Sequence, residues 1–173
     1  MLILIKKNIF FIFLLLSLFG CSNKEELKTT QKYEEDYIEI GVIGDIPASI
    51  EFEKVSFKNI NFLDLNQKTT DALDAIMITK EHLEEASDEK YTDFYLNSSI
   101  PVIFIQSEKA ISAFITHDHT YKNTFENYAQ DYFIGYYEGS SFGIALNGDT
   151  TKDLEDGYAN LFSLLDKFKH TNN

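Results

Sequence analysis

The sequence predicts an α/β fold, a three-layer sandwich in which helices cover both faces of a mostly parallel sheet. Short β-branched runs alternate with more polar helical segments as far as residue 107, and this alternation is typical of parallel strands joined by right-handed crossovers. The last third differs, because two strand-like runs lie close together in residues 131–146 and an amphipathic segment fills residues 151–169. We therefore expect a C-terminal antiparallel hairpin followed by a final helix.

Four segments before residue 110 have the character of strands. Residues 37–44 are β-branched and end in a glycine turn signal, whereas residues 57–65 are interrupted by Asn59 and Asn61. Residues 74–79 form a compact apolar run. Residues 100–107 are almost continuously apolar, which indicates a strand that is covered on both faces.

Helices are predicted between these strands and at the end of the chain. Residues 66–73 suggest a short helical turn, Thr79 can cap a helix with an imperfect apolar face, and residues 107–115 fit either a short helix or a further strand. The final segment keeps one apolar stripe at helical spacing, although Gly157 weakens it by up to about 1 kcal/mol. The stripe consists of Leu154, Tyr158, Leu161, Phe162, Leu165 and Phe168.

The first predicted strand and the segments after it resemble two known architectures. The stretch IGVIGDIP, followed by alternating strands and helices, is similar to the start of one lobe of a periplasmic-binding-protein-like fold. A flavodoxin-like sandwich has the same kind of alternation. We expect one α/β domain over residues 37–170.

The N-terminal residues predict export and a lipid anchor. Lys6 and Lys7 precede an apolar run over residues 9–19, which is too short to cross a bilayer comfortably as a helix. The run ends at LFGC, which contains Cys21, the only cysteine of the chain. LFGC resembles the lipobox of bacterial lipoproteins.

The lipobox resemblance implies that residues 1–20 are a lipoprotein signal peptide and that Cys21 receives a diacylglyceryl group. Residues 21–36 are then a lipidated flexible tether, since they are polar and charged. The expected location is the extracytoplasmic face of the cell membrane, where two or more acyl chains give stable anchoring.

The charge of the chain restricts its partners. The 173 residues carry a formal net charge of −13, and the chain has 15 lysines and no arginine. The excess of acidic residues and the absence of arginine argue against nucleic acid as a partner, because Lys and Arg neutralise phosphates and Arg reads guanine. An acidic domain is also repelled by anionic lipid, so the expected membrane contact is the anchor on Cys21. An envelope protein or a small solute remains as a partner.

A candidate ligand rim lies where the predicted parallel strands end. Open α/β sheets bind ligands beyond the carboxyl ends of their strands, and Asp45, Thr79 and Ser107 follow three of these ends. Asp45 would accept hydrogen bonds, and the two hydroxyls would donate or accept them. The alternative is structural, since Thr79 and Ser107 also fit helix caps and Asp45 fits a turn.

The other candidate sites match no established motif. His117 and His119 invite a metal interpretation with His82 as a third ligand, but the sequence has no zinc motif, and we expect no metal or cofactor. It also has no nucleophile elbow or phosphate-binding loop, so no catalytic residue is assigned. Tyrosines of the predicted hairpin could form an exposed binding face, with some of them in the core: Tyr132, Tyr136 and Tyr137.

Three functions follow from these observations. The leading one is a lipid-anchored, non-enzymatic binding or interaction domain, and the chain is broadly similar to small α/β lipoproteins of Gram-positive bacteria. The second is a solute-binding accessory protein of a transporter, although such receptors close two lobes on their ligand. The third is an exported hydrolase, which would need a nucleophile within reach of a histidine.

Overall fold

The structure is a computed structural model that describes residues 35–171. The predicted signal peptide, Cys21 and the predicted tether up to residue 34 lie outside the described residues. Within the described range the strands are β1 (Ile38–Ile43), β2 (Val55–Asn59), β3 (Ala75–Ile78), β4 (Val102–Ile105), β5 (Phe133–Tyr137) and β6 (Ser140–Ile144).

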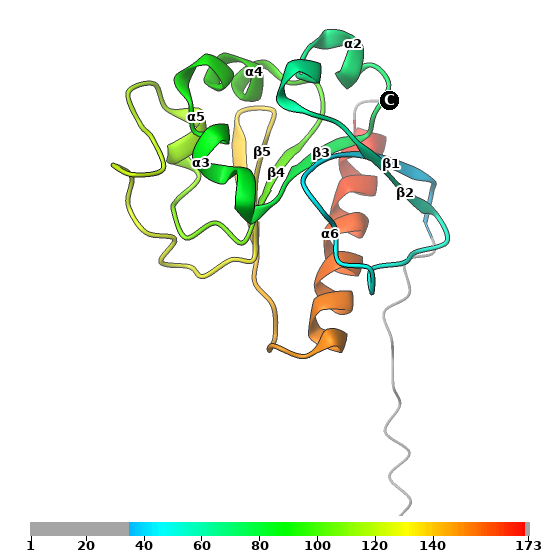
Figure 1. The fold of residues 1–173 in the computed structure, drawn as a ribbon. Helices are drawn as coiled ribbons and strands as arrows, with labels where there is room; N and C mark the ends of the chain where they lie inside the picture. The colour runs from blue at the N-terminus through cyan, green and yellow to red at the C-terminus, as the bar shows by residue number, and fades with distance from the viewer. Residues whose placement is uncertain (1–34, 172–173) are drawn as a thin grey trace, which may run out of the picture.

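The strands form one mixed sheet in the order β2-β1-β3-β4-β5-β6 (Figure 1). The first four strands are mutually parallel, and β5 and β6 pair antiparallel with β4 and with each other. The predicted α/β fold with a parallel sheet and a C-terminal hairpin is therefore confirmed. The order of the first four strands reverses between β1 and β3, which makes a topological switch point there.

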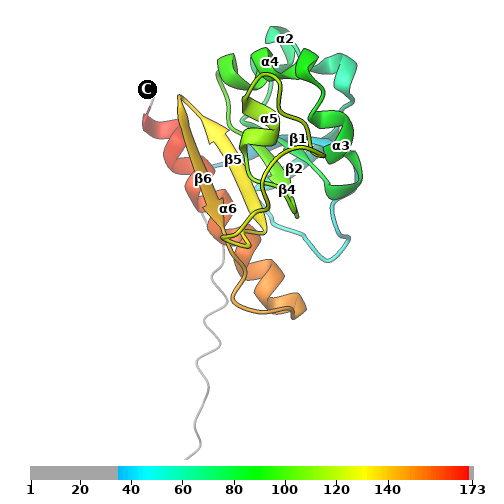
Figure 2. The same ribbon diagram turned by 90° about the vertical axis from the view of Figure 1, so that its left-hand side faces the viewer.

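Helices cover both faces of the sheet, as the side view shows (Figure 2). One long helix, α6, lies on one face, and short helical pieces lie on the other. The α-helices are α2 (Gln67–Thr70), α3 (Leu83–Ala86), α4 (Thr92–Asn97), α5 (Ser112–Ile115) and α6 (Thr151–Thr171), and the 3₁₀ helices are η2 (Phe62–Asp64), η3 (Lys80–His82) and η4 (Glu89–Tyr91).

Two hydrophobic cores result from this layering. Strand residues alternate between the faces, so Val42 and Ile103 pack toward α6 whereas Ile76 and Phe104 pack toward the short helices. The predicted stripe of the last helix meets the first core: Tyr158, Leu161, Phe162 and Leu165 are buried, and Leu154 and Phe168 are partly buried.

The predicted end of the second strand is wrong. Strand β2 stops at Asn59, and a 3₁₀ helix follows where residues 57–65 predict continuous strand. The reason is local. The Asn61 side chain accepts a hydrogen bond from the backbone N–H of Leu63, and the Asp64 carboxylate accepts one from the backbone N–H of Asn61. A capping pattern of this kind starts a helical turn and removes backbone groups from the sheet.

The segment after Thr79 forms several short helices, whereas its apolar face predicts one longer helix. The hydroxyl of Ser87 donates to the carbonyl of Glu84, and Asp88 accepts from the backbone N–H of Lys90. Both bonds compete with a continuous helix. The region is therefore divided into η3, α3, η4 and α4.

Two glycines allow a tight turn and a close packing contact in the C-terminal third of the chain. The hairpin turn places Glu138 and Gly139 at positive φ, as two-residue hairpins prefer. A Cβ at Gly157 would lie 2.3 Å from a Leu146 methyl carbon, so this glycine lets the loop before α6 pack against the helix. Within residues 35–171, no helix has the length and apolar character needed to span a membrane.

Candidate functional site

The candidate site is a cavity of about 700 Å³ beyond the carboxyl end of β4, which we call the β4 cavity. A volume of this order is typical of small-molecule pockets. Its position at the ends of parallel strands agrees with the general location of ligand sites in open α/β sheets. Its wall consists of Gln106, Ser107, Glu108, Glu126, Asn127, Tyr128, Gln130, Asp131, Tyr132, Leu146 and Gly148.

One wall is an irregular segment that connects α5 to β5, over residues 116–132. Asn127 holds this segment against the end of β4, because its backbone N–H donates to the carbonyl of Glu108 over 2.8 Å. Its side-chain amide donates to the carbonyls of Ser107 (3.1 Å) and Asp131 (3.0 Å). Irregular connections of this length usually have a binding role or are disordered, and here the loop is tied down.

Two residues of the cavity wall have a strained backbone. Gln106 and Gln130 both have φ near 56° and both line the β4 cavity. The left-handed region is uncommon for residues other than glycine, and backbone strain of this kind concentrates at functional sites. The backbone N–H of Gln106 donates to the carbonyl of Tyr132 over 2.7 Å, which fixes the strained residue in place.

The electrostatics of the cavity are those of an acidic site. Its wall contains three carboxylates and no lysine or histidine. Glu108 pairs with Lys80 over 2.8 Å, and Glu126 pairs with Lys109 over 2.5 Å. The half-buried Asp131 carboxylate makes no hydrogen bond or ion pair with the described part of the chain, and it lies close to Gly143.

Two tyrosines add aromatic surface to the same cavity. Tyr128 is 82% exposed although it belongs to an ordered loop, and Tyr132 is half-buried at the start of β5. Burial raises the pKa of Tyr132. The other hairpin tyrosines lie elsewhere, with Tyr137 buried and Tyr136 half-buried.

The predicted rim residues do not share one described cavity. Ser107 lines the β4 cavity, but its hydroxyl donates to the carbonyl of Lys109 and accepts from the backbone N–H of the same residue. The Thr79 hydroxyl donates to Glu81 over 2.9 Å. Asp45 is exposed, and neither it nor Thr79 lines any of the cavities described for residues 35–171.

The loops after β3 and β4 nevertheless lie side by side. The ion pair of Lys80 and Glu108 joins them, and the charge of Glu81 contributes to the raised pKa of Tyr132. The β4 cavity therefore lies at the end of the sheet where the sequence predicts a ligand rim, but most of its wall consists of other residues. Ligand binding by Asp45, Thr79 and Ser107 stays a prediction.

A second cavity of about 770 Å³ lies at the switch point between β1 and β3. We call it the β1 cavity. Its wall includes Gly44, the exposed Leu63 and His82, and the stacked rings of Phe62 and Tyr91, whose centroids are 4.8 Å apart. It has more apolar surface than the β4 cavity and combines acidic with basic side chains, so its charges give no comparable preference for a ligand.

The structure does not bring together the three histidines of the metal interpretation. His117 makes ion pairs with Glu89 and Asp93, and Asp118 between the two loop histidines has φ 65°, so the segment is a turn and not a strand. His82 lines the β1 cavity. His82, His117 and His119 form no common ligand group among the described residues.

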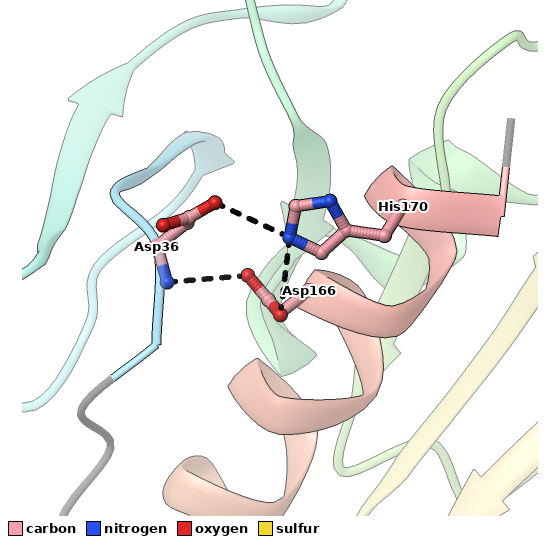
Figure 3. A group of neighbouring side chains, drawn as sticks. All are labelled: Asp36, Asp166 and His170. Atoms are coloured by element: carbon pink, nitrogen blue, oxygen red, sulfur yellow. Dashed lines mark hydrogen bonds and ion pairs between the residues drawn. The ribbon is translucent and has the colours of Figure 1, made fainter. Parts of the chain in front are cut away.

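A different group within the described range has the donor atoms for a metal ion (Figure 3). Asp36 lies just before β1, whereas Asp166 and His170 lie one turn apart on α6. One ligand atom from each lies within 4.8 Å of the others. The sequence could not indicate this group, because Asp36 is far from the other two residues along the chain.

Comparison with protein families, curated proteins and solved structures finds no match for this chain. The functional argument therefore depends on the residues of the chain. Of the cavity residues, the sequence singled out Ser107 and Tyr132 but missed Asp131 and Tyr128. The available signal was the long polar stretch before β5, which has neither helical nor strand periodicity.

Proposed function

We propose that the protein is a lipid-anchored extracytoplasmic lipoprotein whose α/β domain binds a small cationic ligand in the β4 cavity. The observation that carries the ligand assignment is the composition of the cavity wall, which has three carboxylates, two tyrosines and no basic side chain. The lipid anchor follows from LFGC and Cys21.

The preference for a cation follows from elementary electrostatics. The charged side chains of the cavity wall are all carboxylates. Glu108 and Glu126 are paired with Lys80 and Lys109, so an anion would be repelled chiefly by Asp131. An ammonium group would form charge-assisted hydrogen bonds with Asp131, and the faces of Tyr128 and Tyr132 would attract it through their ring quadrupoles. Gln106 and Gln130, both at positive φ, line the same cavity.

Binding is favoured over the alternatives by particular contacts. The hydroxyls of Thr79 and Ser107 bond within their own loops to a carboxylate and to the backbone, and not to a histidine that would activate a nucleophile. The described residues also build a single sheet. A transporter receptor closes two lobes on its solute, so this architecture supports a single-domain binding protein.

The anchor is tested by replacing the lipid-bearing residue. Cys21→Ala is expected to lose metabolic labelling with a fatty acid and to move from the detergent phase to the aqueous phase in detergent phase separation. Ser22→Ala is the matched control and should keep both properties. Unchanged partitioning of Cys21→Ala would contradict the lipobox interpretation.

The ligand class is tested with three probes of equal chain length, namely diaminobutane, butanediol and succinate. We expect the full-length protein in detergent to bind only the diamine by titration calorimetry. Asp131→Asn should weaken this binding by about tenfold or more, since a charge-assisted hydrogen bond is worth about 1.5–3 kcal/mol. Asp45→Asn, an exposed change outside the cavity, should leave it unaltered. Preferential binding of succinate, no binding of the diamine, or an equal loss in both variants would overturn the assignment.

A further inference from the structure

The C-terminal turn of α6 holds an imidazole that faces two carboxylates with the same ring atom (Figure 3). His170 Nε2 lies 3.2 Å from Asp36 Oδ2 and 3.6 Å from Asp166 Oδ2. The backbone N–H of Asp36 donates to Asp166 Oδ1 over 3.3 Å, which fixes the first described residues against the helix. Three donor atoms from two distant segments therefore converge on one point.

A second histidine shows that this convergence is particular to His170. His117 also lies between two carboxylates, but its Nδ1 faces Glu89 at 3.3 Å and its Nε2 faces Asp93 at 3.2 Å. The two ring nitrogens point in different directions, so one ion cannot meet both carboxylates and the ring. In contrast, both carboxylates at His170 face the same ring nitrogen.

The distances at His170 fit a tetrahedral metal ion. Zinc binds histidine nitrogen and carboxylate oxygen at about 2.0–2.2 Å, which places neighbouring donors of a tetrahedron about 3.3–3.5 Å apart. The measured separations of 3.2 and 3.6 Å lie on either side of this range. The remaining separation, between the two carboxylates, is at most 4.8 Å.

The charge balance of this corner also favours a cation. The Asp166 side chain belongs to a residue that is only 7% exposed, although it carries an acidic group. The Glu35 carboxyl forms a hydrogen bond with Asp166, which adds a further acidic group to this corner. The nearby Lys169 amino group lies 3.0 Å from Asp74, so its charge is shared with a fourth carboxylate.

We infer that Asp36, Asp166 and His170 bind a divalent transition-metal ion of the zinc class at the point where the chain enters the domain. Water supplies the fourth ligand. The ion joins the start of β1 to the end of α6. This inference does not depend on the ligand of the β4 cavity or on lipidation of Cys21.

The inference is tested by titrating the chelator-treated, full-length protein in detergent with zinc chloride by calorimetry. We expect one saturable site. His170→Gln should weaken zinc binding by at least about tenfold, because changes around metal ligands have effects of this size. His117→Gln is the matched control, and it should leave the affinity unchanged because its neighbours cannot converge on one ion.

Cobalt(II) gives an independent readout, since a tetrahedral site has an intense visible absorption that an octahedral ion on surface carboxylates lacks. This absorption should be present in the native protein and His117→Gln and absent in His170→Gln. Asp166→Asn should also lose it, with circular dichroism confirming that the variant is folded. No saturable site in the native protein, or the same affinity and spectrum in His170→Gln, would overturn the inference and leave an ion-pair cluster.

Discussion

The two faces of the sheet are covered in different ways. A single helix of 21 residues, α6, covers much of one face, whereas four- to six-residue α-helices and three-residue 3₁₀ helices cover the other. Both faces bury an extensive apolar core. The difference lies in continuity, because a long helix has few ends and a chain of short helices has many.

Helix ends leave backbone groups without helical partners, and side chains must satisfy them. On the short-helix side this brings polar residues and tight turns to the carboxyl edge of the sheet, where the β1 cavity has walls from η2, η3 and η4. The α6 side is more regular along its length, and its candidate metal group lies at its last turn. Regular packing and candidate sites therefore occupy different places in the molecule.

The largest expected effect compares one buried ring on each face. Phe162 on α6 contacts the rings of Phe52, Phe57 and Tyr158, and Phe114 on α5 stacks on Phe104 with centroids 3.8 Å apart. Phe162→Ala should lower the free energy of unfolding by about 4–5 kcal/mol, and Phe114→Ala by about 3 kcal/mol. The short helix can move into the space more readily than α6 can.

Chemical denaturation of both variants measures this difference. Phe125→Ala is the control, since this ring is 73% exposed and its removal should change stability by less than about 0.5 kcal/mol. Equal losses at Phe162 and Phe114 would show that the short helices are held as rigidly as α6.

The same contrast explains what the sequence could predict. The stripe of α6 and the apolar strands depend on local periodicity, and both were predicted correctly. The end of β2 depends on side-chain bonds of Asn61 and Asp64, which periodicity does not register. Apolar residues alternate irregularly with Asn59, Asn61 and Asp64 there, so the sequence predicts an interrupted strand.

The candidate sites were harder to predict for a related reason. Ser107 and Tyr132 could be found because they stand next to strands, whereas Asp131 acquires its role from the loop that Asn127 holds in place. The group around His170 requires the end of α6 to meet the start of β1. Contacts between such distant segments depend on the whole fold and leave no local signal.

A smaller effect is expected at Gly157, where local propensity and packing act in opposite directions. Alanine is about 1 kcal/mol better than glycine within a helix, but its Cβ would lie 2.3 Å from the Leu146 methyl carbon. Overpacking usually costs about 1–3 kcal/mol, so Gly157→Ala should lower the free energy of unfolding by about 1 kcal/mol overall.

Asn160→Ala, an exposed change on the same helix, is the control for propensity alone and should raise stability slightly. Thermal unfolding of the two variants gives the comparison. A stability gain in Gly157→Ala would mean that the loop before α6 moves aside without cost, which would make the packing of α6 less rigid than we infer.

The smallest effect concerns two threonine–carboxylate pairs, one on each side of the molecule. At the start of α6, two hydrogen bonds hold the pKa of Asp153 below its usual value. The Thr150 hydroxyl has the larger effect, and the Thr150 backbone N–H has the smaller one. After β3, the backbone N–H of Glu81 is the first cause of its lowered pKa, and the Thr79 hydroxyl is the second. Thr150→Val should therefore raise the pKa of Asp153 more than Thr79→Val raises that of Glu81.

Both lowered pKa values stabilise the fold above the ordinary carboxyl pKa, and this contribution is lost as the pH falls through the folded-state value. Each valine should accordingly make the acid side of the stability profile shallower. Carboxyl chemical shifts followed by NMR during an acid titration measure the two pKa values directly. A larger change at Glu81 would mean that the Thr79 hydroxyl lowers the pKa of Glu81 more than the backbone N–H of Glu81 does.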